Sequence, residues 1–180
     1  MKNFCISFII VAIIILSVIG LNLPENAVHE EYLRIHIRAD SNDTVAQAVK
    51  YQVKDAVVDY LTPFIAECQN KKQAEDMLND NLSKIEKVAD QVLERAGFDY
   101  KSTAKLKEEQ FPTRVYGGLE LESGIYDALI IELGSGRGDN WWCVVYPPLC
   151  FVGEESGYQY RSKIKELIDR FYSNKEKQAI

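Results

Sequence analysis

The stretch Gly134–Phe151 constrains the fold more than any other part of the chain. It reads GSGRGDNWWCVVYPPLCF, with alternating glycines in its first half and the diproline Pro147-Pro148 in its second half. Glycine readily adopts positive φ angles, whereas a diproline removes two N–H donors and ends a strand. The stretch therefore predicts a glycine loop, then a strand, then a rigid proline turn.

Both tryptophans of the chain, Trp141 and Trp142, stand side by side in this predicted strand. Successive side chains of a strand point to opposite faces of its sheet. On a sheet that is covered on one face only, at most one of the two packs inward, and the other needs a second layer or a partner. The alternative is that both are core residues.

The N-terminus has the character of a targeting or anchoring segment. Met1-Lys2-Asn3 is short and positive, and Phe4–Leu21 is apolar apart from two serines and a glycine. An apolar run of this length lies between a signal-peptide core and a short membrane span. We expect residues 1–21 to be a signal peptide or an N-terminal membrane anchor, residues 22–31 to be a linker, and the remainder to lie outside the cytoplasm, contacting the membrane only through residues 1–21.

Export changes how the cysteines are interpreted, because disulfides persist outside the cytoplasm. Cys68, Cys143 and Cys150 follow the apolar segment. A proline turn between Cys143 and Cys150 can bring the chain back on itself, so these two are the best candidates for a disulfide, and Cys68 is expected to be a free thiol. The alternative is that Cys143 and Cys150 are two buried free cysteines.

Residues 32–99 predict one strand followed by helices. Residues 32–39 alternate apolar and polar side chains, which is typical of a half-buried strand and places His36 on a solvated face. Helical periodicity follows in three segments, which begin after Ser41, at Lys71 and at Ser83. The last of these starts with a capping box and ends at Gly97.

From about residue 100 the apolar period changes from helical to two, which predicts further strands, the clearest over residues 125–133. An amphipathic helix follows after residue 162. The order of elements predicts an α+β fold, with helices packed on one face of a mostly antiparallel sheet of about four to five strands. We expect one domain over residues 32–152 and a C-terminal amphipathic helix within residues 153–180.

Charge and motifs exclude several functions. The net charge is −6 and no basic stripe is present, so nucleic acid is not an expected partner. The three glycines are followed by Asp139 rather than by the Lys-Ser/Thr of a phosphate-binding loop, and their spacing does not match a dinucleotide fingerprint. Too few ligands accompany the cysteines for a metal site. We expect neither a cofactor nor a metal.

One enzymatic alternative uses a cysteine nucleophile. Cys143 and His36 can meet if the fold allows, with Asp40 or Asn140 orienting the imidazole, and such a pair is typical of exported hydrolases and transpeptidases that act on cell wall. Two features argue against it. Cys143 falls inside a strand rather than at a helix N-terminus, where a thiolate is favoured, and Cys150 would tend to trap it as a disulfide.

Several stretches together resemble the stage II sporulation protein R family of endospore-forming bacteria. They are LRIHIRADSND at 33–43, KYQVKDAVVDYL at 50–61, FPTRVYGGLELESGIYDAL at 111–129 and the 134–151 stretch already quoted. The resemblance covers residues 32–152, and its most specific part is NWWCVVYPPLCF. Asp40 departs from the family pattern, which has asparagine there.

The resemblance implies a signalling protein rather than an enzyme. Members are made in the forespore and exported into the space that faces the mother cell. They are needed there to activate a membrane-embedded aspartic protease that processes pro-sigma-E. No catalytic residues carry over. A structural envelope module without an activating role is a further alternative. Candidate contacts with the extracytoplasmic part of the protease are, first, Arg137, Asn140, Trp141 and Trp142 and, second, Arg114 and Tyr116.

Overall fold

The structure is a computed structural model that describes residues 30–116, 118–151 and 158–178. The segment predicted to be a signal peptide or anchor and nearly all of the linker lie outside the described residues. The elements in chain order are β1 (Leu33–Arg38), α2 (Thr44–Ile65), α3 (Lys71–Arg95), β2 (Ser102–Phe111), β3 (Arg114–Tyr116), β4 (Leu119–Leu121), β5 (Gly124–Leu133), β6 (Asn140–Tyr146) and α4 (Tyr158–Gln178).

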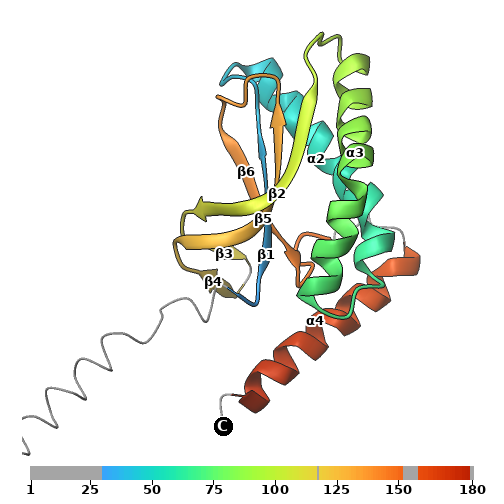
Figure 1. Cartoon of the computed structure of the whole chain (residues 1–180), viewed down its shortest axis with the longest axis vertical. Helices are drawn as coiled ribbons and strands as arrows, with labels where there is room; N and C mark the ends of the chain where they lie inside the picture. Colours follow the sequence, from blue (N-terminus) through green and yellow to red (C-terminus); the bar gives the residue numbers. More distant parts are fainter. Residues whose placement is uncertain (1–29, 117, 152–157, 179–180) are drawn as a thin grey trace, which may run out of the picture.

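A mixed four-stranded sheet is the centre of the molecule, with the strand order β2-β5-β1-β6 (Figure 1). β5 runs antiparallel to β2 and parallel to β1, and β6 runs antiparallel to β1. The short strands β3 and β4 form a separate antiparallel pair near one end of β2 and β5. The predicted α+β fold is therefore confirmed, and the sheet contains one parallel pair.

Helices α2 and α3 pack on one face of the sheet, where the main core lies (Figure 1). The β1 side chains Leu33, Ile35 and Ile37 point into this core. Helix α2 begins as predicted, because the Asp43 carboxylate accepts hydrogen bonds from the backbone N–H groups of Val45 and Ala46.

The structure corrects the prediction of separate helices starting at Lys71 and Ser83, because α3 is one continuous helix. Its buried positions stay in phase across the predicted break, where Asn81 is buried among them. The Asn81 amide donates to Met77 O and its Oδ1 accepts from the Tyr60 hydroxyl, at 2.7 and 3.0 Å. These hydrogen bonds pair the polar atoms of Asn81 inside the core, so the helix continues through this position. The capping-box residues that begin at Ser83 therefore lie in the middle of a helix and not at its start. Gly97, with φ of 84°, follows the end of α3 as predicted.

Helix α4 lies across the lower ends of the other elements (Figure 1). Ile164 and Leu167 are buried in the main core, and the Phe171 ring contacts Tyr32 and Tyr146 at centroid distances of 5.6 and 6.2 Å. A cavity of about 280 Å³ lies beside this helix, with both acidic and basic side chains in its lining. Within the described ranges, no helix has the length and apolar character that crossing a membrane requires.

Candidate functional site

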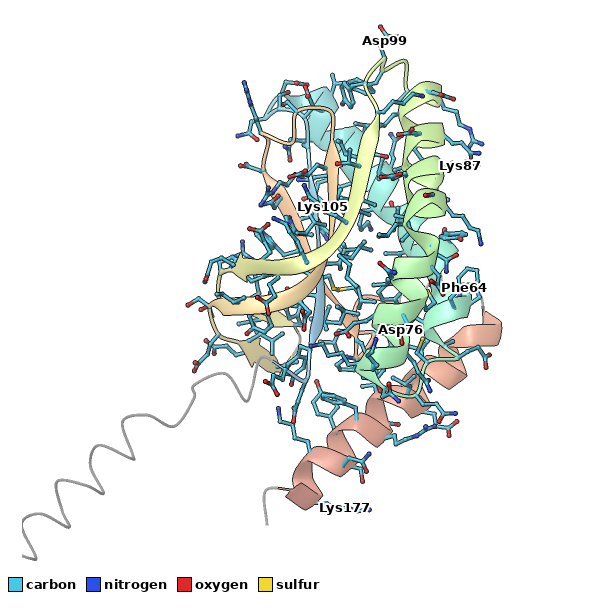
Figure 2. All side chains as sticks on the ribbon, viewed as in Figure 1. Phe64, Asp76, Lys87, Asp99, Lys105 and Lys177 are labelled. Atoms are coloured by element: carbon cyan, nitrogen blue, oxygen red, sulfur yellow. A yellow bond between two sulfur atoms is a disulfide. The ribbon has the colours of Figure 1, made fainter. Side chains whose placement is uncertain are left out.

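The face of the sheet opposite α2 and α3 carries the polar side chains of β1. Arg34, His36 and Arg38 point to this face, and the paired residues of β6 place Asn140, Trp142 and Val144 beside them. Figure 2 shows Lys105 of β2 on this side and Lys87 of α3 on the opposite side. We call this surface the helix-free face, because neither α2 nor α3 covers it (Figure 1). Four of the six sequence-predicted contact residues lie on it or beside it, namely Asn140, Trp142, Arg114 and Tyr116.

Arg34 is fully buried in an aromatic cage at one end of the helix-free face. Its Cζ lies 4.2 Å from the ring centroid of Phe111, 4.6 Å from that of Tyr126 and 5.8 Å from that of Tyr116. Arg34 Nη2 donates a hydrogen bond of 2.9 Å to the Tyr116 hydroxyl, whereas Nε and Nη1 have no hydrogen-bond partner. The guanidinium is thus held mainly by aromatic faces.

His36 follows Arg34 along the strand and is buried rather than solvated, which corrects the sequence prediction. Its ring stacks on Trp142 at 4.9 Å and meets the Phe111 ring edge-on at 5.5 Å. Nδ1 lies 3.4 Å from Asn140 Oδ1, and Nε2 has no hydrogen-bond partner. Burial, and then the nearby charge of Arg38, lower the pKa of His36 to about 4. The imidazole is therefore neutral near pH 7.

Charged residues continue the helix-free face away from the aromatic cage. Arg38 pairs with Glu132 at 3.0 Å and with Glu109 at 3.5 Å. Lys105 pairs with Glu132 at 2.6 Å, and this hydrogen bond is the largest cause of the lowered pKa of Glu132. The two arginines of β1 therefore differ sharply: Arg38 has carboxylate partners and Arg34 has only aromatic and phenolic ones.

The β3–β4 pair brings two more predicted contact residues to the same place. Tyr116 is half-buried and bonds Arg34, as described above. Arg114 is exposed, with its Cζ 5.9 Å from the ring centroid of Trp142. Trp142 is half-buried, so one part of its ring contacts His36 and Phe111 while another part is open to solvent.

The glycine loop positions β6 instead of belonging to the helix-free face. Asp40 Oδ1 accepts a hydrogen bond of 2.6 Å from Ser135 N, and Gly138 N donates one of 2.8 Å to Ala39 O. A Cβ on Gly138 would overlap the Ser41 carbonyl, so only glycine fits at this contact. The Asp40 carboxylate, where the family resemblance predicts asparagine, is thus an acceptor for the loop backbone.

The remaining predicted contact residues lie elsewhere. Arg137 is exposed within the glycine loop. Trp141 points to the opposite face from Trp142, packs at the edge of the main core and lies 5.9 Å from Lys54 Nζ. The prediction that the adjacent tryptophans point to opposite faces is therefore confirmed.

The cysteines form the arrangement that the sequence favours. Cys143 and Cys150 are joined by a disulfide, and Cys68 is a buried free thiol whose pKa burial raises to about 11. Cys143 points into the core on the helix side, whereas His36 points to the helix-free face. The structure does not bring the two together as a nucleophile and a base. No cluster of metal-ligating side chains exists within the described ranges.

Comparison with known proteins identifies the family. The sequence profile of stage II sporulation protein R matches residues 29–156, which is most of the chain. The chain belongs to the stage II sporulation protein R family. It is 30% identical over 151 residues to stage II sporulation protein R of Bacillus subtilis (strain 168). That match covers 84% of this chain and 66% of the relative, slightly less than two thirds of its length. No solved structure matches.

For this member of the sporulation protein R family, sequence reasoning missed the centre of the site. Arg34 stands at an alternating polar position, which is ordinarily solvated on a half-buried strand. The residues that bury it, Phe111, Tyr116 and Tyr126, come from β2, β3 and β5 and are distant in sequence. The stretch at 111–129 supported the family resemblance and supplied Arg114 and Tyr116 as candidate contact residues, but nothing in it indicated that its aromatic rings bury Arg34.

Proposed function

We propose that this chain is an exported signalling protein of endospore formation. It acts between the forespore and the mother cell and activates the membrane-embedded aspartic protease that processes pro-sigma-E. The observation that carries the proposal is the family match over residues 29–156. The apolar segment Phe4–Leu21 supports export, and the Cys143–Cys150 disulfide is typical of a protein that works outside the cytoplasm.

The proposed mode of action is binding rather than chemistry. Trp142 and Arg114 are partly or fully exposed beside one another on the helix-free face. Tryptophan and arginine are the residue types that most often dominate binding energy at protein interfaces. A partly exposed tryptophan fixed by the His36 and Phe111 rings is preorganised, so little conformational freedom is lost when a partner covers it.

The test measures pro-sigma-E processing in sporulating cells that carry Trp142→Ala or Arg114→Ala. The matched controls are Phe64→Ala, which removes an aromatic ring that is 38% exposed on α2, and Arg95→Ala, which removes an exposed arginine at the end of α3. Both control residues belong to the helices on the opposite face. Immunoblots of the exported fraction and thermal melting of purified protein report amount and folding.

We expect the Trp142 and Arg114 variants to be exported and folded but to leave pro-sigma-E unprocessed, while the controls signal normally. Normal processing in both variants would refute the helix-free face as the contact surface. Normal processing in a strain that lacks the protein altogether would refute the activating role and favour a structural module of the envelope.

A further inference from the structure

The buried charge of Arg34 is unexplained by its described neighbours. The side chain is fully buried, and a guanidinium keeps its charge at any physiological pH. Its Nε and Nη1 lack hydrogen-bond partners, and no acidic side chain within the described ranges pairs with it. A buried cation without a counter-anion is strongly unfavourable, since the charge has lost its water without gaining an opposite charge. Such a group is expected to serve binding rather than stability.

The aromatic cage offsets this cost only in part. The faces of Phe111 and Tyr126 attract a cation, but each such contact contributes far less than a desolvated ion pair. Arg38 lies on the same face further along the strand, and its charge is compensated by two glutamate carboxylates. Arg34 has no such carboxylate partner, although its N–H groups could bind one within the aromatic cage.

We propose that Arg34 is a binding site for the carboxylate of an acidic side chain on a protein partner. In the unbound protein, the Tyr116 hydroxyl holds the place of one carboxylate oxygen. A carboxylate binds a guanidinium through two parallel N–H···O bonds. Both edges of the guanidinium that allow this include Nη2, one together with Nε and the other with Nη1. Nη2 carries two N–H groups, one on each edge, and the Tyr116 hydroxyl accepts from one of them. Moving this hydroxyl away frees the one edge that it blocks, since Nε and Nη1 have no hydrogen-bond partner.

Tyr116 is the residue that has to move. Its ring is half-buried, so a change of its side-chain rotamer opens the cage from the solvent side. Trp142 and Arg114 lie beside the cage, because the Phe111 ring contacts both Arg34 and Trp142 and Arg114 lies over the Trp142 ring. A ligand that reaches Arg34 therefore also meets partly exposed interface-type residues, which fits an acidic side chain on a polypeptide better than a free small anion. Only the choice of a protein as the source of the carboxylate rests on the proposed function.

The experiment uses the 15N-labelled full-length chain in neutral detergent micelles and follows the Arg34 Nε–H resonance by NMR. The probes are an acetylated and amidated Gly-Glu-Gly peptide, its Gly-Gln-Gly counterpart, sodium acetate and sodium chloride, all at matched ionic strength. We expect a saturable shift with the glutamate peptide, a weaker one with acetate, and none with the glutamine peptide or chloride.

Three variants separate a binding site from a structural residue. Arg34→Met removes the resonance, so peptide binding is followed by tryptophan fluorescence in the wild type and in this variant. We expect binding to be lost in Arg34→Met, with its melting temperature unchanged or raised. Arg38→Met, the matched control, should bind as the wild type does. Tyr116→Phe removes the competing hydroxyl and should tighten binding about tenfold, because one hydrogen bond to a charged group no longer has to be broken.

Several outcomes would contradict the proposal that Arg34 binds a carboxylate. Equal responses to the glutamate and glutamine peptides, a response to acetate but not to the glutamate peptide, or weaker binding in Tyr116→Phe would overturn it. A large fall in melting temperature of Arg34→Met together with unchanged peptide binding would assign Arg34 to the core. The titration contains no protease, so it can fail while Trp142→Ala still abolishes signalling, and the proposed function would then stand without this site.

Discussion

His36 makes the stability of this protein sensitive to acid in a defined pH window. Its pKa is about 4 in the folded chain, because the ring is buried and lies near Arg38, against an ordinary value of 6.5 in the unfolded chain. The unfolded state therefore binds a proton more readily than the folded state does. Stability that is fully present above pH 6.5 is lost as the pH falls towards 4.

The size of the effect follows from the difference between the two pKa values. Each pKa unit corresponds to about 1.4 kcal/mol, so the free energy of unfolding should fall by about 3 kcal/mol between pH 7 and pH 4 on account of His36 alone. Glu109 and Glu132 also have lowered pKa values, but their ordinary value is 4.5, so their protonation contributes mainly below this window.

The assay is urea unfolding at pH values from 7 to 4, followed by tryptophan fluorescence, for the wild type and for His36→Phe. Phenylalanine keeps a ring between Trp142 and Phe111 but cannot titrate. We expect the wild-type free energy of unfolding to fall through this window and that of His36→Phe to change much less. His29→Gln is the control for the other histidine of the chain and should behave as the wild type does.

If the free energies of unfolding of the wild type and His36→Phe fall equally from pH 7 to pH 4, protonation of His36 is not the cause of the loss. This conclusion does not depend on the absolute stability of either protein. If His36→Phe does not fold, His36→Gln provides the same comparison, since glutamine does not titrate either. A wild type whose stability is constant from pH 7 to pH 4.5 would show that the ring is solvated and that the stacking on Trp142 does not hold in solution.

Three further substitutions have expected outcomes. Gly138→Ala places a Cβ against the Ser41 carbonyl and should cost about 1–3 kcal/mol by chemical denaturation, and an unchanged midpoint would show that the loop is not docked there. Cys150→Ser opens a disulfide between residues seven positions apart and should cost about 2.5 kcal/mol. Reduction of the wild type should have the same effect, and a further loss on reducing the variant would contradict this assignment. Phe171 is half-buried, so Phe171→Ala should cost less than the loss of a core phenylalanine, about 1–3 kcal/mol, and should expose α4 to limited proteolysis. Unchanged cleavage would mean that Phe171 does not hold the helix.

Local patterns predicted most of the fold. The 134–151 stretch forms a loop, a strand and a turn as its glycines and prolines require, and period-two alternation correctly located β1 and β5. These features depend on backbone conformations and on which face of an element is buried, and both are visible within a few residues. The break predicted at Ser83 was wrong because a capping pattern is also compatible with the exposed surface of a long helix.

The candidate site was less predictable because it depends on tertiary neighbours. Alternation along β1 showed that Arg34 and His36 share a face, but not that Phe111 and Trp142 would cover them. A strand position opposite a core is solvated only if nothing packs on it, and the residues that cover Arg34 and His36 come from β2, β3, β5 and β6. The low pKa of His36 and the unpaired nitrogens of Arg34 are consequences of that cover, so they could not be inferred from the strand alone.

Residues 134–151 fix the position of the site but supply few of its side chains. At one end of β6, Asp139 N donates to Asn42 Oδ1 at 2.6 Å and Lys50 Nζ donates to Asp139 O at 3.0 Å. At the other end, the disulfide joins Cys143 of β6 to Cys150 in the turn that follows the strand, and the Tyr146 hydroxyl donates to Gln69 O in the connection between α2 and α3. Trp142 lies between these two anchors. A substitution in either anchor that leaves the protein folded should therefore shift Trp142 against His36 and alter its fluorescence, although neither anchor touches the helix-free face.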